Sequence, residues 1–265
     1  MESSNSSKHK LHGKITIITG GASGIGEATA HCFANYGASA VVISDVQDEE
    51  AQNVVAAIGA DRCTFIRCDV TDEEQVKSLI DSTVQKYGRV DVMFSNAGVP
   101  SSCHQTVMDF DLAACNKLFA VNVGGMAASV KHAARAMVEG GIKGSIICTA
   151  SVVADRGTGK FTDYTMSKHA VLGLVRSASL QLGEFGIRVN AVSPGPIGTP
   201  LVRAMSRSGD VELAKQMEAT LSLKKGSLLT VKHVAEAVAV LASDESEFIT
   251  GHNLAVDGGF IYRPV

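Results

Sequence analysis

The chain has 265 residues and a formal net charge of −3, with 45% hydrophobic and 19% charged residues. This balance is that of an ordinary globular protein with enough apolar side chains to fill a sizeable core. The negative charge and the scattered Lys and Arg residues argue against a nucleic-acid partner, which would require a basic face. No apolar run approaches the length that spans a bilayer, so no membrane partner is expected.

The first residues and the cysteines indicate a cytoplasmic protein. Residues 1–10 (MESSNSSKHK) are polar, so we predict a disordered tail, and no apolar segment follows them as a secretory signal would require. The six cysteines form no Cys-x-x-Cys pair and are interpreted as reduced, mostly buried thiols. The eight histidines lack the spacings typical of a metal site, so no metal is expected.

Short β-branched runs alternate with helical patterns along the rest of the chain. The predicted strands are 14–19, 40–44, 63–68, 90–95, 144–149, 187–192 and 253–256, and the clearest helices lie at 72–87, 112–139 and 164–185. Strands joined by helices are parallel and buried on both faces. We therefore predict a Rossmann-type doubly wound α/β fold, a parallel sheet of about seven strands with helices on both faces. No linker interrupts the pattern, so residues 11–265 should form a single domain.

A glycine-rich turn, TGGASGIG at positions 19–26, follows the first predicted strand. Its glycines permit a tight turn, close approach of the backbone to a pyrophosphate and close helix–strand packing. The helix that begins there offers free N–H groups and a partial positive charge to phosphates. Such turns also occur as plain strand-to-helix connections, but the place at the first turn of an α/β chain favours a dinucleotide site.

Asp45 ends the second predicted strand, 19 residues after Gly26. A carboxylate there can accept hydrogen bonds from both adenosine-ribose hydroxyls and would repel a 2′-phosphate. Neither the glycine loop nor the two positions after Asp45 hold a Lys or Arg. NAD is therefore predicted over NADP, although Asp45 could instead cap a helix that begins near Gln47.

The motifs, taken in order and at their spacing, resemble those of the short-chain dehydrogenase/reductase family over residues 11–260. They are the glycine loop, Asp69-Val70 after the third strand, Asn96-Ala97-Gly98 after the fourth, Asn122, Ser151, Tyr164-x-x-x-Lys168, and Pro194-Gly195 with Thr199. The resemblance implies that cofactor binding involves Gly20, Ser23, Gly24, Ile25, Gly26, Asp45, Val46, Asp69, Val70, Asn96, Ala97, Gly98, Tyr164, Lys168, Pro194, Gly195, Ile197 and Thr199.

Longer phrases are similar to the plant branch of this family that works in specialised metabolism. GGASGIGEATA and SKHAVLGLVRSASLQLGEFGIRVN are examples, and the branch includes secoisolariciresinol, borneol, isopiperitenol and xanthoxin dehydrogenases and nepetalactol-related enzymes. The segment 155–163 (DRGTGKFTD) differs from the loops of any one member, which leaves the substrate open.

Tyr164 and Lys168 are predicted to handle a proton. A Tyr phenol titrates near pH 10, and a Lys at i+4 lies on the same helix face, where its positive charge should lower the phenol pKa. The resemblance implies that Lys168 also holds the nicotinamide ribose and that Ser151 positions the substrate oxygen. It also implies that Asn122 supports a water that relays the proton from Lys168. His169 and Cys148 flank these residues in sequence but are expected to point elsewhere.

The expected substrate is a hydrophobic alcohol such as a cyclic terpenoid. The walls of the substrate pocket are predicted to come from residues 99–104, 152–162 and the segment after Pro196, with an apolar lid near 197–225. Arg156 and Lys160 could instead bind an acidic group. The leading hypothesis is NAD-dependent oxidation of a secondary alcohol or lactol. The alternatives are a non-redox cyclase or isomerase with NAD bound structurally, and a silent NAD-binding protein. By resemblance, a homodimer or homotetramer is expected.

Overall fold

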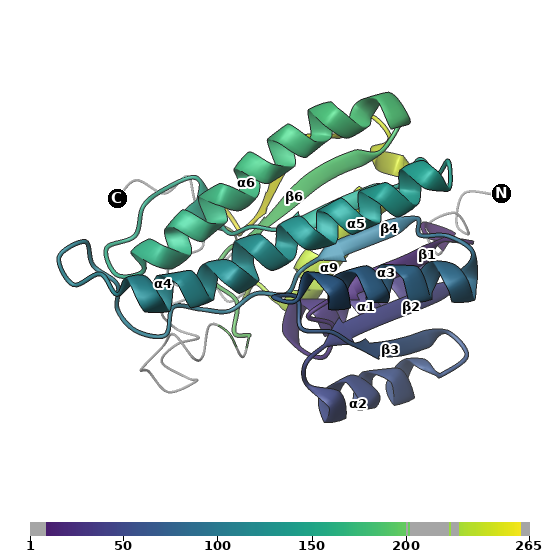
Figure 1. The fold of residues 1–265 in the computed structure, drawn as a ribbon, viewed down its shortest axis with the longest axis horizontal. Helices are drawn as coiled ribbons and strands as arrows, with labels where there is room; N and C mark the ends of the chain where they lie inside the picture. The colour runs from purple at the N-terminus through teal and green to yellow at the C-terminus, as the bar shows by residue number, and fades with distance from the viewer. Residues whose placement is uncertain (1–8, 200, 202–222, 224–227, 261–265) are drawn as a thin grey trace.

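The computed structural model describes residues 9–199, 201, 223 and 228–260. Its centre is one parallel sheet with strand order β3-β2-β1-β4-β5-β6-β7 (Figure 1). The strands within the described residues are β1 (Ile15–Thr19), β2 (Ala40–Asp45), β3 (Cys63–Arg67), β4 (Val92–Ser95), β5 (Ser145–Thr149), β6 (Arg188–Pro194) and β7 (Asn253–Val256). The order reverses between β1 and β4, so the loops that leave these two strands diverge to opposite faces of the sheet.

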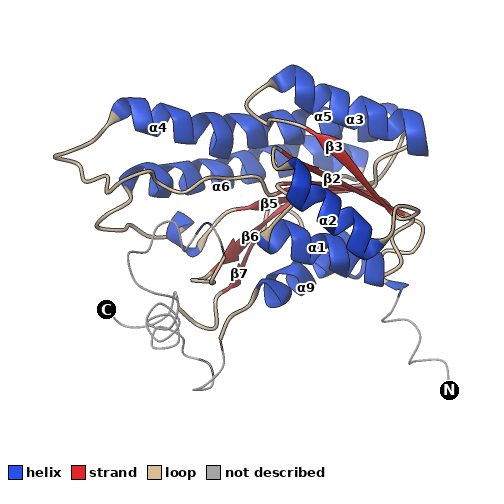
Figure 2. Cartoon of the chain, turned by 90° about the horizontal axis from the view of Figure 1, so that it is seen from below, coloured by secondary structure: helices blue, strands red, loops and turns tan. Residues whose placement is uncertain are grey.

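Helices cover both faces of the sheet (Figure 2). On one face lie α1 (Gly24–Asn35), α2 (Asp48–Ile58) and α9 (Val231–Ala242). On the other lie α3 (Glu73–Tyr87), α4 (Leu112–Phe119), α5 (Met126–Glu139) and α6 (Thr162–Leu182). The predicted doubly wound parallel sheet with helices on both faces is therefore confirmed.

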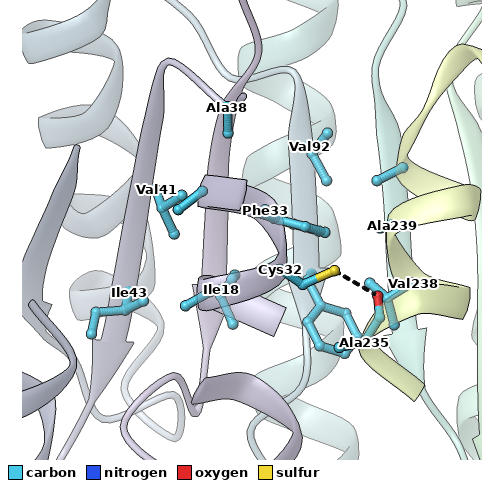
Figure 3. Packing of buried hydrophobic residues seen from close by; sticks show 14 of the residues in the cluster. Ile18, Cys32, Phe33, Ala38, Val41, Ile43, Val92, Ala235, Val238 and Ala239 are labelled. Carbon is cyan, nitrogen blue, oxygen red and sulfur yellow. Dashed lines mark hydrogen bonds between the residues drawn. The ribbon is translucent and has the colours of Figure 1, made fainter. Parts of the chain in front are cut away.

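Two apolar cores lie between the sheet and the helix layers. Every residue of β1 and β2 is buried, as expected of strands covered on both faces. In the core beneath α1 and α9, the Phe33 ring is fully buried, and the Cys32 thiol donates a weak 3.7 Å hydrogen bond to the Ala235 carbonyl (Figure 3). Full burial of a large apolar side chain such as Phe33 contributes about 1.5–3 kcal/mol. These contacts hold α1, and with it the glycine loop, against the sheet.

The structure refines the predicted boundaries in three places. The helix predicted at 112–139 is interrupted by a π-helical segment, η2 (Ala120–Gly125), between α4 and α5. The strand predicted at 187–192 extends to Pro194, and α6 ends in a 3₁₀ turn, η4 (Gly183–Phe185). Of the tail predicted at 1–10, residues 1–8 lie outside the described residues, whereas Lys10 is described and pairs with Glu245 at 2.7 Å.

The structure also shows the state of the cysteines and the character of the helices. All six cysteines are free, and all but Cys103 are buried. None of the helices in the described part of the chain combines the length and apolar character needed to cross a membrane.

Candidate active site

A cleft of about 680 Å³ opens at the carboxyl ends of the strands. The residues that follow β1, β2, β3, β4, β5 and β6 all contribute to its lining, and the reversal of strand order between β1 and β4 lies beneath it. In open α/β sheets this crevice is where ligands bind, because diverging loops leave a gap at the strand ends.

The glycine loop forms one end of the cleft and tolerates no side chain at two positions. Gly20 has a φ of +64°, and a Cβ there would lie 2.9 Å from the Cα of Ala97. A Cβ on Gly26 would lie 1.9 Å from the carbonyl oxygen of Gly20, which is well inside van der Waals contact. The backbone of the loop is therefore free to approach a ligand closely, next to the N-terminus of α1.

Asn96 connects the loops that follow three strands. Its amide nitrogen donates to the carbonyls of Thr19 and Gly20 at 3.1 and 3.2 Å, and its amide oxygen accepts from the Thr149 hydroxyl at 3.0 Å. The Thr19 hydroxyl accepts in turn from the backbone N–H groups of Asn96 and Ala97. These bonds fix the glycine loop against the floor of the cleft.

Asp45 ends β2 and lines the cleft, and the sequence predicts the adenosine ribose at this position. One carboxylate oxygen accepts from the Ala22 N–H of the glycine loop at 3.0 Å, and the other accepts from the N–H groups of Val46 and Gln47. The Asp45 side chain therefore lines the cleft, where a ligand could reach it, and also orders the turn before α2. The ligand role and the capping alternative are compatible with each other.

Arg67 is a positively charged residue beside Asp45 in the sheet, because the two residues are register partners in β3 and β2. Its guanidinium donates to the Val46 carbonyl at 2.8 Å and to the Asp48 carboxylate at 2.5 Å. The cleft lining does not include it. The carboxylate of Asp45, rather than the Arg67 guanidinium, therefore faces the ligand space.

Tyr164, Ser151 and Lys168 all line the cleft. Ser151 follows β5, whereas Tyr164 and Lys168 stand one turn apart on the first part of α6. The Lys168 Nζ lies 5.5 Å from the centre of the Tyr164 ring and donates a hydrogen bond to the Thr149 carbonyl at 2.9 Å. Tyr164 and Lys168 thus share one helix face.

The expected lowering of the Tyr164 pKa is wrong for this structure. Burial raises the pKa of Tyr164 to about 12, although its hydrogen bond with Ser151 acts in the opposite direction. Burial also lowers the pKa of Lys168 to about 8, because an ammonium loses its hydration there. Burial, rather than a charge interaction between the two side chains, is the main cause of both pKa shifts.

Asn122 lies behind the cleft wall rather than on it. It lies in the π-helical segment η2 and is fully buried. Its amide oxygen accepts a hydrogen bond from the Val99 N–H at 2.8 Å, and its amide nitrogen donates one to the Val99 carbonyl at 3.0 Å. The same nitrogen lies 3.3 Å from the Ser167 hydroxyl. Its polar atoms are engaged by these protein partners, so the side chain positions Val99, and the water relay stays a prediction.

The cleft gathers nearly all of the predicted residues. Every predicted cofactor-binding residue except Gly26 lines it, together with Ser151, and Gly26 lies directly beneath the loop. His169 is exposed, with Nδ1 2.9 Å from the Thr165 carbonyl oxygen, and Cys148 is fully buried in the core, so both point elsewhere as expected.

The predicted substrate walls are only partly right. Val99, Val152, Val153, Thr158 and Phe161 line the cleft, but residues 100–104 do not. Ser101 is buried and hydrogen-bonds the buried Asp163, whereas residues 102–104 are exposed. Of the predicted lid at 197–225, Ile197, Thr199 and Leu201 line the cleft and most of the remainder lies outside the described residues.

Sequence reasoning missed three lining residues of interest. Thr149 supplies the carbonyl that holds Lys168, Val121 comes from the π-helical segment, and Phe260 reaches the cleft from the C-terminal end. The ring of Phe260 lies 4.1 Å from the Arg156 guanidinium carbon, so this Arg stacks on an aromatic wall instead of entering the lining. No local motif marks any of the three.

The cleft therefore brings together a glycine cradle, the Asp45 carboxylate, a half-buried Tyr164 and a buried Lys168. A family model described as "Enoyl-(Acyl carrier protein) reductase" matches residues 20–261. The chain belongs to the short-chain dehydrogenase/reductase family. Membership implies a nicotinamide nucleotide, NAD or NADP, and the glycine cradle that a Cβ would fill fits such a group.

The chain is similar to plant enzymes over nearly its whole length. It is 56% identical over 257 residues to a (+)-cis,cis-nepetalactol synthase of Nepeta racemosa, covering 97% of this chain and 95% of the relative. It is 55% identical over 255 residues to the "(-)-isopiperitenol/(-)-carveol dehydrogenase, mitochondrial" of Mentha piperita, covering 96% of each. Among solved structures, levodione reductase matches with a TM-score of 0.88 at 30% identity, covering 96% of this chain and all of the other.

Proposed function

We propose that this protein is an NAD-dependent dehydrogenase that oxidises a hydrophobic secondary alcohol or lactol, with cyclic terpenoids as the substrate class. One observation carries the proposal: the side chains of Tyr164, Ser151 and Lys168 line the same cleft as the glycine cradle and a set of apolar side chains. An alcohol oxygen placed there would meet two hydroxyls that can hold it and exchange a proton with it.

The apolar wall supports a hydrophobic substrate. It includes Val99, Val121, Val152, Phe161 and Phe260. Among the described residues that line the cleft, the charged side chains are Asp45 and Asp69 at the adenosine end and Lys168 beneath the cofactor space. A sugar or acid would find few polar partners at the other end, whereas a compact terpenoid would bury apolar surface there.

The same charges support NAD rather than NADP. A 2′-phosphate at the ribose would meet the Asp45 carboxylate, and the Arg67 guanidinium is already held by Asp48 and the Val46 carbonyl. Repulsion by a carboxylate without a free cation disfavours the extra phosphate.

The side chains on the cleft floor suggest how the proton moves. The nicotinamide of the bound cofactor supplies the hydride acceptor. Ser151 Oγ holds the substrate oxygen, and Tyr164 Oη takes the hydroxyl proton as its own proton leaves towards Lys168. Lys168 is the base of the pair, because its pKa of about 8 lies far below the value of about 12 for Tyr164. The Thr149 carbonyl keeps Lys168 Nζ in place.

A second candidate is a non-redox cyclase or isomerase of a reactive monoterpenoid enol, with NAD bound structurally. The observation that favours it is the 56% identity to a nepetalactol synthase. On this scaffold, Ser151 and Tyr164 would orient the enol oxygen within the same apolar wall.

One assay separates the two candidates. The protein is incubated with NAD and a panel of cyclic terpenoid alcohols and lactols, and NADH absorbance is followed while products are separated by chromatography. The dehydrogenase predicts NADH in step with ketone or lactone. A changed product ratio from an enol substrate, without NADH from any alcohol, would overturn the dehydrogenase and favour the cyclase. Repeating the assay with NADP tests the cofactor.

Assembly and location complete the proposal. A homodimer or homotetramer is supported by exposed apolar side chains on α6, such as Leu180, and light scattering would measure its mass. A cytoplasmic location is supported by the six free thiols, and imaging a fluorescent fusion of the full chain would test it.

A further inference from the structure

Asp163 is a fully buried carboxylate directly before Tyr164 on the first turn of α6. One oxygen, Oδ1, accepts hydrogen bonds from the Tyr164 N–H at 2.8 Å and from the Ser101 hydroxyl. The other, Oδ2, is buried and has no hydrogen-bond partner among the described residues. A buried polar atom without a partner destabilises a fold, so helix stability alone does not account for this side chain.

Two acids at helix N-caps show what capping alone requires. Asp72 before α3 and Asp111 before α4 are exposed, and each accepts from two backbone N–H groups of its own helix. Asp163 instead shares one oxygen between its own helix and Ser101, which is 62 residues away in sequence. This side chain therefore links two segments that carry different parts of the site.

Ser101 belongs to the loop between β4 and α4, and three contacts join the part of this loop from Val99 to Gln105 to its surroundings. Asn122 bonds both backbone groups of Val99 at its start. At its end, Gln105 bonds Lys160 and Thr162 through the backbone, at 2.8 and 3.1 Å. The Ser101–Asp163 bond lies between these two contacts in sequence. Its acceptor, Asp163 Oδ1, also accepts from the backbone N–H of Tyr164, which neither of the other two contacts involves.

We propose that Asp163 is a positioning residue that ties the loop carrying Val99 to the first turn of α6, so that the substrate wall and the Tyr164 phenol keep a fixed spacing. The effect on catalysis rests on the proposed function, because it assumes that Tyr164 exchanges a proton with the substrate. The existence of the link between the two segments does not depend on the proposed function. Loss of the link should let both segments move, and a displacement of about 1 Å at a reacting group can cost about 100-fold in rate.

The test compares Asp163→Ala, Asp163→Asn and Ser101→Ala in the full chain, with Asp111→Ala as the matched control. The Asp111 side chain bonds only the first turn of α4, so its loss removes a cap without touching the link. We expect Asp163→Ala to lower kcat for alcohol oxidation by about tenfold or more with little change in NAD affinity. Asp163→Asn should recover most of kcat, because the acceptor Oδ1 remains. Ser101→Ala should mainly raise KM.

Hydrogen exchange gives a readout that needs no substrate. Amides of residues 99–105 and of the first turn of α6 should exchange faster together in Asp163→Ala and in Ser101→Ala, but not in Asp111→Ala. If wild type oxidises no alcohol, the proposed function fails, and the exchange result still decides the link. Unchanged exchange in both segments of Ser101→Ala, or an Asp163→Asn variant as impaired as Asp163→Ala, would overturn the inference. Ser101→Ala decides the matter even where Asp163→Ala fails to fold.

Discussion

The Nζ of Lys168 donates its hydrogen bond to the Thr149 carbonyl, 2.9 Å away at the end of β5. This bond fixes the positive charge beneath the cleft, 5.5 Å from the centre of the Tyr164 ring. Burial of the Lys168 amine brings its pKa to about 8, and no comparable effect brings Tyr164 towards neutrality. The pH response of the site should therefore report Lys168.

The first prediction concerns that pH response. Oxidation of an alcohol releases a proton, so it needs the unprotonated form of Lys168, which accumulates as the pH rises through about 8. We expect kcat/KM for oxidation to rise about tenfold per pH unit below this value and to level off above it. Reduction consumes a proton and should show the opposite slope. Initial rates in both directions across this range would measure the effect.

Lys168→Arg is the variant that tests the assignment, because a guanidinium stays charged throughout the range. It should lose the rising limb together with most of the activity. Lys160→Arg is the control, since Lys160 lies on an exposed loop and does not line the cleft. A rising limb that persists unchanged in Lys168→Arg would contradict the assignment.

The second prediction concerns the Tyr164 phenol. Tyr164→Phe removes the phenol hydroxyl while leaving the aromatic ring in the cleft lining. Hydride transfer should fall by about 100-fold or more, since general acid–base groups contribute at least this much. NAD binding, measured by calorimetry, should stay near the wild-type value because the cofactor is held by many other residues. A variant that retains wild-type turnover would refute the proton role of Tyr164.

How far the sequence predicted this site depends on the physical origin of each feature. The glycine loop and the parallel sheet were predictable because both follow from local sterics and from the alternation of strands and helices. Residues that meet only in space were not. Phe260 and Asp163 carry no local motif, and their roles arise from contacts with Arg156 and Ser101, which lie about 100 and 62 residues away along the chain.

The direction of the Tyr164 pKa shift shows the same limit. Spacing places Lys168 on the helix face of Tyr164, and this alone predicts attraction and a lower phenol pKa. Burial is a property of the packed cleft, and it is the main cause of the raised Tyr164 pKa. Position on a helix is readable from a sequence, whereas desolvation requires the complete set of neighbours.

The third prediction concerns cofactor choice. Asp45→Ala removes both the carboxylate that is proposed to face the ribose and the acceptor for the Ala22 N–H. NAD affinity should fall about tenfold, and the preference for NAD over NADP should shrink by a larger factor. Glu49→Ala is the control, because Glu49 is an exposed acid on the first turn of α2 that does not line the cleft. Glu49→Ala should therefore keep the preference for NAD. Equal NAD and NADP affinities in wild type would contradict the role of Asp45.

The fourth prediction concerns the glycine cradle. Gly26→Ala would place a Cβ 1.9 Å from the carbonyl oxygen of Gly20, so the turn between β1 and α1 must open. We expect loss of measurable NAD binding and a lower melting temperature, because displaced backbone cannot approach the phosphates. Gly173→Ala is a matched control, since that glycine is exposed in the middle of α6 and a Cβ there meets no atom within 4 Å. It should stabilise the helix by about 1 kcal/mol and leave NAD binding intact. If Gly26→Ala instead binds NAD as well as Gly173→Ala does, the cradle does not hold the cofactor.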